Sequence, residues 1–271
     1  MSSNSDANSQ GASGRLLLDE PAPGVARLTI SNPAKRGALD HAILDSFTRI
    51  LPALDARCVI ITGQKSSFSA GYDLDGLGES VSAQDAEELV AHPFTAALAA
   101  VEDYRFPTIA ALNGHALGGG LELAISCDLR LAVGTIALAM PPGRLGLVYS
   151  HTGIRKFIDA IGDARTRELF LTGRRIDART AHAWGLVNAL SEPDRLADDA
   201  VELAVEIAAN APLAQIGNKR VIRELLEARS RLDAVTEQEL IELRRACFAS
   251  QDFREGVHAF VEKRTPHFTG R

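Results

Sequence analysis

Two segments of the chain combine small residues in a way that leaves backbone amides open to a ligand. The first is Phe68-Ser-Ala-Gly-Tyr-Asp73, which follows a strand-like run ending at Gly63. The second runs from Asn113 to Glu122, where Gly118-Gly-Gly120 precedes a predicted helix. Small side chains let a ligand approach the backbone closely, and the first N–H groups of a helix have no intrahelical partner. The helix dipole adds to their attraction for negative charge.

Two such turns that face one another would hold one developing oxyanion between a pair of N–H groups. In enzymes that use this arrangement, each donor contributes about 3–4 kcal/mol. The enolate of a thioester is an oxyanion of this kind. Either motif alone is equally compatible with a tight structural turn, and their combination in this order and spacing is what makes the chemical interpretation specific.

Other glycine-containing motifs for ligand binding or catalysis do not match the sequence of these segments. A dinucleotide fingerprint requires glycine at the position of Leu123, and a P-loop requires lysine at Gly120. The run Ser67-Phe-Ser69-Ala-Gly71 lacks the first glycine of a serine-hydrolase elbow. Nucleotide binding and serine hydrolysis are therefore less well supported than enolate chemistry.

The elements that must position these turns alternate between strand and helix patterns. A hairpin is predicted from Arg15–Leu18 and Val25–Ser31, and Asp40 is placed to cap the helix that follows. Uninterrupted apolar runs predict three buried strands, at Cys58–Thr62, Thr108–Leu112 and Leu129–Val133. Helical spacing is found between them, at residues 85–104 and 121–127. The alternation predicts an α/β fold.

From His151 onward the pattern is almost wholly helical. Periodic stretches occupy residues 152–161, 164–171, 195–209, 213–227, 234–249 and 252–263. We therefore expect a disordered polar leader at residues 1–14, an α/β core at 15–200 and a helical region at 201–271.

Composition restricts the possible partners. The 271 residues carry a formal charge of −6, which argues against a nucleic-acid or anionic-membrane surface. No apolar stretch approaches the roughly 20 residues of a membrane span, and the polar N-terminus has no secretory signal pattern. Three separated cysteines offer neither a disulfide framework nor a metal site. These features predict a cytoplasmic protein.

Three segments, FSAGYDL, TIAALNGHALGGGLELAISCDLRLA and AFVEKRTPHF, resemble signature segments of the enoyl-CoA hydratase/isomerase family, part of the crotonase superfamily. The resemblance extends from about residue 25 to residue 271. It implies an α/β, crotonase-like spiral of ββα turns with a helical C-terminal trimerisation region. It also implies a homotrimer or homohexamer and an acyl-CoA thioester substrate. Coenzyme A is part of that substrate, so no separate cofactor and no metal is expected.

Within the resemblance, the backbone N–H groups of Tyr72 and Gly119 match the oxyanion-hole positions of the family. Glu122 matches one of the two glutamates that its hydratases use as acid and base. The second glutamate would fall near Pro142, where the sequence has no carboxylate. Hydration of a double bond needs one group to activate water and a proton source for the α-carbon. Isomerisation and decarboxylation therefore stay open beside hydration.

Tyr149 lies where the similar methylmalonyl-CoA decarboxylase branch has an active-site tyrosine. It would orient a carboxylate or protonate an enolate, although a partly buried tyrosine with a satisfied hydroxyl is an ordinary structural feature. His151 is a weaker candidate, with a packing role at least as well supported. The missing glutamate also leaves open a catalytically silent acyl-CoA binder, because a fold alone does not fix a function.

Five residues are expected to contact the CoA moiety. Lys35 and Arg36 lie in a segment similar to the one that passes the nucleotide, and Ala70 would allow close approach to the backbone. Phe260 and Lys263 match positions that contact CoA, commonly across a subunit boundary. Taken only as charges, such lysines and arginines belong equally well to a solvated surface.

Overall fold

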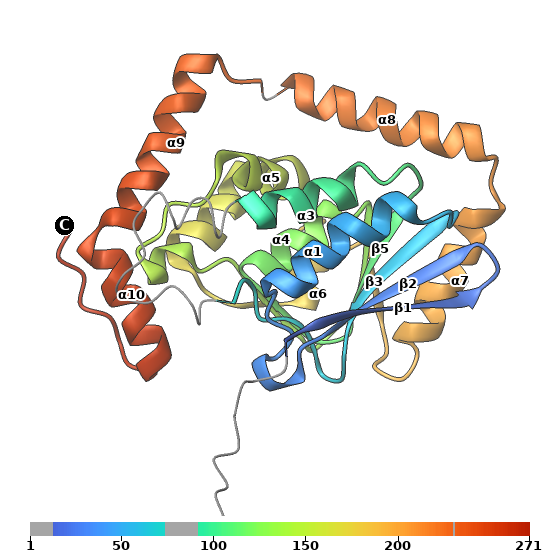
Figure 1. The fold of residues 1–271 in the computed structure, drawn as a ribbon, viewed down its shortest axis with the longest axis horizontal. Helices are drawn as coiled ribbons and strands as arrows, with labels where there is room; N and C mark the ends of the chain where they lie inside the picture. Colours follow the sequence, from blue (N-terminus) through green and yellow to red (C-terminus); the bar gives the residue numbers. More distant parts are fainter. Residues whose placement is uncertain (1–12, 74–91, 230) are drawn as a thin grey trace, which may run out of the picture.

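The computed structural model describes residues 13–73, 92–229 and 231–271 (Figure 1). The predicted leader at 1–14 and the start of the predicted helix at 85–104 thus lie mostly outside the described residues. Within these ranges the chain forms a mixed α/β fold with two sheets, which confirms the predicted class.

The larger sheet has six strands in the order β1-β2-β3-β5-β7-β10 within the described residues. They are β1 (Arg15–Ala22), β2 (Val25–Ser31), β3 (Cys58–Gly63), β5 (Thr108–Leu112), β7 (Leu129–Val133) and β10 (Ala189–Ser191). The first two form the predicted antiparallel hairpin, and every later pairing is parallel. All five residues of β5 are buried, as expected of a parallel strand that is covered on both faces.

The smaller sheet has very short strands in the order β4-β6-β8-β9. They are β4 (Ser67–Ser69), β6 (His115–Leu117), β8 (Ala137–Ala139) and β9 (Ile176–Asp177). The chain enters the larger sheet through β3, β5 and β7, and after each of these strands it crosses to the smaller sheet through β4, β6 and β8. Helices follow these strand pairs, so the chain advances as the expected spiral of ββα turns.

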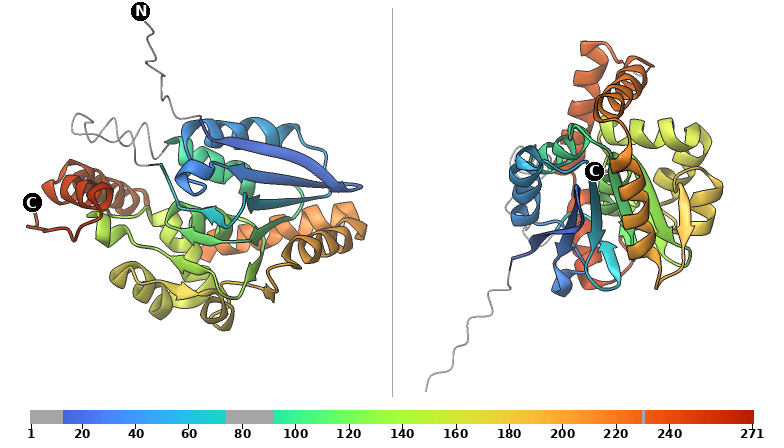
Figure 2. Two further views of the ribbon diagram at one scale, coloured as in Figure 1. Left: turned by 90° about the horizontal axis from the view of Figure 1, so that it is seen from below. Right: turned by 90° about the vertical axis from the view of Figure 1, so that its right-hand side faces the viewer.

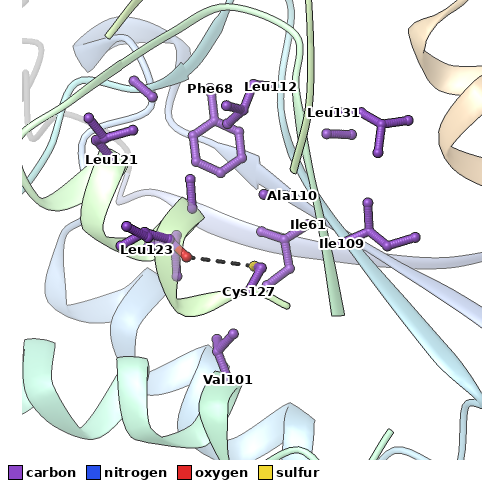
Figure 3. Close-up of a cluster of buried hydrophobic side chains, with 14 of the residues drawn as sticks. Ile61, Phe68, Val101, Ile109, Ala110, Leu112, Leu121, Leu123, Cys127 and Leu131 are labelled. Atoms are coloured by element: carbon purple, nitrogen blue, oxygen red, sulfur yellow. Dashed lines mark hydrogen bonds between the residues drawn. The ribbon is translucent and has the colours of Figure 1, made fainter. Parts of the chain in front are cut away.

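Helices cover the larger sheet. In Figure 1, α1 (His41–Ile50) and α3 (His92–Glu102) lie in front of it and α7 (Leu196–Ala209) lies behind it. Asp40 caps α1 as predicted, because its carboxylate accepts a hydrogen bond of 3.0 Å from the amide of Ile43. Apolar side chains of the two sheets meet those of α3 and α4 (Gly119–Ser126) in one buried cluster, which includes Phe68, Val101 and Leu123 (Figure 3). This cluster fixes α4 behind the glycine-rich turn.

The C-terminal half is helical, as predicted. Its elements are the short η4 (Pro142–Leu145), then α5 (His151–Thr172), α6 (Ala178–Ala183), α8 (Pro212–Arg229), α9 (Ala234–Ala249) and α10 (Gln251–Glu262). The predicted division of α5 into two helices corresponds to a break at Gly162, whose φ of 75° and ψ of 172° are not helical. The expected boundary at residue 200 falls within α7, which packs on the larger sheet. The helices α8 and α9 extend outward from the core (Figures 1 and 2).

No helix in the described ranges is long and apolar enough to cross a membrane.

Candidate active site

The two predicted turns meet at a cavity of about 1140 Å³. Gly71 has a φ of 102°, and a Cβ atom there would lie 2.8 Å from the carbonyl oxygen of Leu117. A Cβ atom on Gly119 would lie 3.4 Å from the amide nitrogen of Tyr72. The backbones of the two turns are therefore in direct contact, and only glycine fits at Gly71. Tyr72 and Gly119 both line the cavity, as their predicted roles require.

Each turn is held by its neighbours in the fold. Leu39 pairs with Tyr72, with its amide donating to the carbonyl of Gly71 at 2.8 Å. The amide of Gly118 donates to the carbonyl of Ala139 at 2.9 Å, which ties the second turn to β8. Because Gly119 is the first residue of α4, its N–H has no partner within that helix.

Glu122 lies in the first turn of α4 and lines the same cavity. Only 3% of its surface is exposed. The hydroxyl of Tyr149 donates a hydrogen bond to its Oε2, and the ammonium group of Lys156 lies 3.6 Å from its Oε1. Burial raises the pKa of Glu122, while the Lys156 cation and the Tyr149 hydrogen bond oppose that rise. The group is thus easier to protonate than an exposed glutamate.

Tyr149 also lines the cavity, two residues before α5 begins. Its ring contacts that of Phe170 edge-on, with 5.6 Å between the centroids. Burial and the adjacent Glu122 carboxylate hold its pKa well above the usual range, so its hydroxyl keeps its proton at neutral pH. A Cβ atom on Gly153 would lie 2.7 Å from the Tyr149 ring, so this glycine lets α5 approach closely.

The position expected for a second carboxylate is also on the cavity wall. Pro142 is buried there at the start of η4, and Glu122 is the only acid among the lining residues that the structure describes. His151, the weaker candidate, is directed elsewhere, since its Nε2 lies 3.5 Å from the carboxylate of Glu237 on α9.

The residues predicted to contact CoA are only partly brought together. Lys35, Arg36, Ala70 and Phe260 line the cavity, whereas Lys263 is an exposed residue after the end of α10 and is not on its described wall. Four further cations that sequence reasoning missed line the same cavity. They are Arg144, Arg175, Arg244 and Arg264.

Arg144, Arg175 and Arg244 are scattered in the sequence, and no pattern distinguishes them from solvated surface charges. The same holds for Lys156, which lies among other polar residues of α5. Arg264 lies within the segment AFVEKRTPHF, but the resemblance assigned no role to it.

Comparisons with known proteins agree with the fold. The family model described as Enoyl-CoA hydratase/isomerase matches residues 20–271. YngF of Bacillus subtilis (strain 168), which bears the enoyl-CoA hydratase/isomerase name, is 35% identical over 91% of this chain and 95% of its own. The 2,3-dehydroadipyl-CoA hydratase of Escherichia coli (strain K12) is 32% identical, over 91% of this chain and 96% of the hydratase.

Among solved structures, a methylmalonyl-CoA decarboxylase in complex with 2-nitronate-propionyl-CoA superposes with a TM-score of 0.86 at 28% identity. The match covers 96% of this chain and 100% of the decarboxylase. Two sheets wound as a ββα spiral, with the two glycine-containing turns at one cavity, are typical of a crotonase-type protein. The chain belongs to the enoyl-CoA hydratase/isomerase family.

Proposed function

We propose that the protein binds an acyl-CoA thioester with its carbonyl oxygen between the amides of Tyr72 and Gly119. Glu122 then moves a proton to or from a carbon next to the thioester. The observation that carries this proposal is the buried Glu122 carboxyl group, which opens onto the same cavity as both amides and is hydrogen-bonded to Tyr149. The two N–H groups stabilise the enolate that forms when a carbon–hydrogen bond is broken.

A single carboxyl group of this kind suits the isomerisation of an enoyl-CoA. As a carboxylate, Glu122 takes a proton from one carbon of the acyl chain, and as a carboxylic acid it returns the proton to another. General acid–base catalysis is most efficient when the pKa of the group lies near the working pH. Burial raises the pKa of Glu122 from its usual acidic value, and this brings the pKa closer to a neutral working pH.

Decarboxylation is the second candidate, and Tyr149 favours it. Loss of CO₂ from a carboxylated acyl-CoA leaves the same enolate, which needs only one proton donor. The neutral hydroxyl of Tyr149 and the Glu122 carboxyl group are both placed at the cavity to provide it. The likeness to a methylmalonyl-CoA decarboxylase supports this alternative.

The test is incubation with a 3-enoyl-CoA, crotonyl-CoA and methylmalonyl-CoA, with products separated by chromatography and identified by mass and ultraviolet absorbance, because the isomers of an enoyl-CoA have equal mass. We expect turnover of the 3-enoyl-CoA or of methylmalonyl-CoA, and a decrease of ~10²–10⁴ in that rate for Glu122→Gln. Glu237→Gln, which removes a half-exposed acid on α9, is the control and should retain the rate. A Glu122→Gln protein as fast as the wild type would refute the proposal. Binding of every thioester without turnover would instead identify a silent acyl-CoA binder.

A further inference from the structure

A buried lysine lies behind Glu122, on the side away from the cavity. The ammonium group of Lys156 on α5 is 2.8 Å from the hydroxyl of Ser126 and 3.6 Å from Oε1 of Glu122, and it also pairs with Oε1 of Glu102 on α3. Only 14% of the Lys156 side chain is exposed, and Lys156 is not among the described residues of the cavity wall. Three helices thus contribute to one polar cluster.

The cluster shares one cation between two carboxylates of different exposure. Glu122 is 3% exposed and Glu102 is 33% exposed at their side chains. A positive charge at this distance favours the ionised form of a carboxyl group, and a second negative charge opposes it. The two oxygens of Glu122 have different partners, since Tyr149 donates to Oε2 and Lys156 faces Oε1. Each oxygen of the Glu122 carboxyl group therefore has its own partner, and the two partners together fix the orientation of the group.

Other charged groups near α4 are engaged elsewhere. Arg130 of β7 donates to backbone carbonyls around the C-terminal end of α4, including that of Cys127 at 2.7 Å. His115 of β6 accepts a hydrogen bond of 2.9 Å from the amide of Ala137. The strands β4 and β5 carry no charged or titratable side chain. At the start of α5, His151 faces Glu237 of α9.

We propose that Lys156 is a positioning residue for the proton chemistry at Glu122, and that Glu102 moderates its effect by sharing its charge. The inference rests on the function proposed above, and it concerns how that site is adjusted. Lys156 fixes the Oε1 side of the carboxyl group and determines the pH range in which Glu122 exchanges its proton. Glu102 is the more exposed carboxylate of the cluster. Because it also pairs with Lys156, it weakens the electrostatic effect of Lys156 on Glu122.

The proposal predicts shifts of opposite sign for two variants. Lys156→Met removes a cation that lowers the pKa of Glu122, so this pKa rises. Glu102→Gln removes a negative charge that raises the pKa of Glu122, so this pKa falls. A merely structural role for the cluster would not produce opposite shifts. Because Lys156 lies off the described cavity wall, kcat should change more than KM.

The experiment is a carbon-13 NMR titration of the full chain labelled at glutamate side-chain carboxyls. The Glu122 resonance is identified by its loss in Glu122→Gln. We expect its midpoint at higher pH in Lys156→Met, at lower pH in Glu102→Gln, and near the wild-type value in Lys156→Arg, which keeps the charge. The limb of the pH–rate profile that reports Glu122 should move in the same directions.

Lys219→Met is the matched control. Its ammonium group is similarly buried, with 13% of the side chain exposed, and pairs with Asp128 at 2.8 Å. It should leave the Glu122 midpoint unchanged. Midpoints that do not move, or that move in the same direction in Lys156→Met and Glu102→Gln, overturn the proposal. If Lys156→Met does not fold, Glu102→Gln still decides, because an unchanged or raised midpoint refutes the role. Full activity of Glu122→Gln would refute the proposed function instead, so the two failures are distinguishable.

Discussion

The hydroxyl of Tyr149 donates a hydrogen bond to the carboxyl group of Glu122, although 27 positions separate the two residues in the sequence. Glu122 lies in the first turn of α4 and Tyr149 precedes α5, so the contact depends on how these two helices pack. Gly153 permits this packing, because a Cβ atom there would lie 2.8 Å from Oε1 of Glu122. Under the proposed function, the two side chains would act together in proton transfer.

Tyr149→Phe removes the hydrogen bond that lowers the pKa of Glu122, so we expect this pKa to rise. If Glu122 acts as a base, the acidic limb of the pH–rate profile moves to higher pH. A hydrogen bond to a charged group contributes about 1.5–3 kcal/mol, so its loss should lower the ionised fraction of Glu122, and kcat with it, by roughly 10-fold or more at a pH below the raised pKa. Tyr104→Phe is the control, since its buried hydroxyl donates to the carbonyl of Ala56 at 2.6 Å, away from the cavity. An unchanged profile in Tyr149→Phe would contradict the prediction.

Strands and helices with strong local signals could be predicted from the sequence. The strands β5 and β7 were expected at the residues where they occur, because each is an apolar run bounded by turn residues. The helix α9 was likewise expected at Ala234–Ala249, where Asp233 caps its first turn. The strands of the smaller sheet could not be predicted. They have two or three residues each, too few to show an alternating pattern.

The candidate site was predictable where backbone geometry creates it and unpredictable where side chains converge from distant elements. Glycine spacing located the two turns, and the resemblance located Tyr72 and Gly119 within them as well as Glu122 and Tyr149. Lys156 carried no signal, because a lysine on a polar helix is typical of a solvated surface. Its role depends on α5 packing against α3 and α4, which is a property of the tertiary structure.

Gly119→Pro should abolish turnover and leave much of the fold intact. Proline is tolerated at the first position of a helix, where Gly119 lies, but it removes the N–H that would hold the enolate oxygen. We expect kcat to fall by about 10²–10³ or more. Gly119→Ala is the matched control, because its Cβ meets the Phe94 ring at the same 3.0 Å while the N–H remains. Equal activity of the two folded variants would show that the Gly119 amide is not an oxyanion donor.

The protein should assemble as a homotrimer or homohexamer. Residues 212–229 form α8, which buries no residue in the single chain and exposes large apolar side chains. These are Leu213, Val221, Ile222 and Leu225. Val221, Ile222 and Leu225 lie within five positions of one helix, and exposed apolar side chains gathered in this way are typical of interaction sites. Light scattering should give three or six times the mass of the 29.0 kDa chain, and a monomer at working concentration would contradict the prediction.

Phe260 and Lys263 should contribute to CoA binding. Phe260 is on the cavity wall, and Lys263 follows it beyond the end of α10. We expect Phe260→Ala and Lys263→Ala to weaken CoA binding measured by calorimetry. Lys65→Ala serves as the control, because this lysine lies outside the segments that resemble the CoA-contacting segments of the family. Unchanged CoA affinity in Lys263→Ala would argue against its assignment.

Glu122 supplies a carboxyl group for hydration, whereas Pro142 stands where a second carboxyl group is expected. Both residues line the cavity, but proline has no ionisable side chain and can neither activate water nor protonate a carbon. A two-carboxylate hydratase divides these two tasks between its acids. With Glu122 as the only acid on the described wall, efficient addition of water to a 2-enoyl-CoA should be impaired.

We therefore expect hydration of crotonyl-CoA to be slow relative to the native reaction, whether that reaction moves a double bond or releases CO₂. Either reaction needs a single proton-transfer group, which Glu122 supplies, with Tyr149 placed to assist the second. The measurement is the loss of crotonyl-CoA absorbance at saturating substrate. Pro142→Glu places a carboxylate at the expected position and should raise the hydration rate, while Pro193→Glu, at an exposed proline that is not on the described cavity wall, serves as the control. A wild-type kcat of hundreds per second, far above the roughly 10 s⁻¹ median of enzymes, would overturn the argument. It would mean that a carboxylate other than those on the described cavity wall activates water.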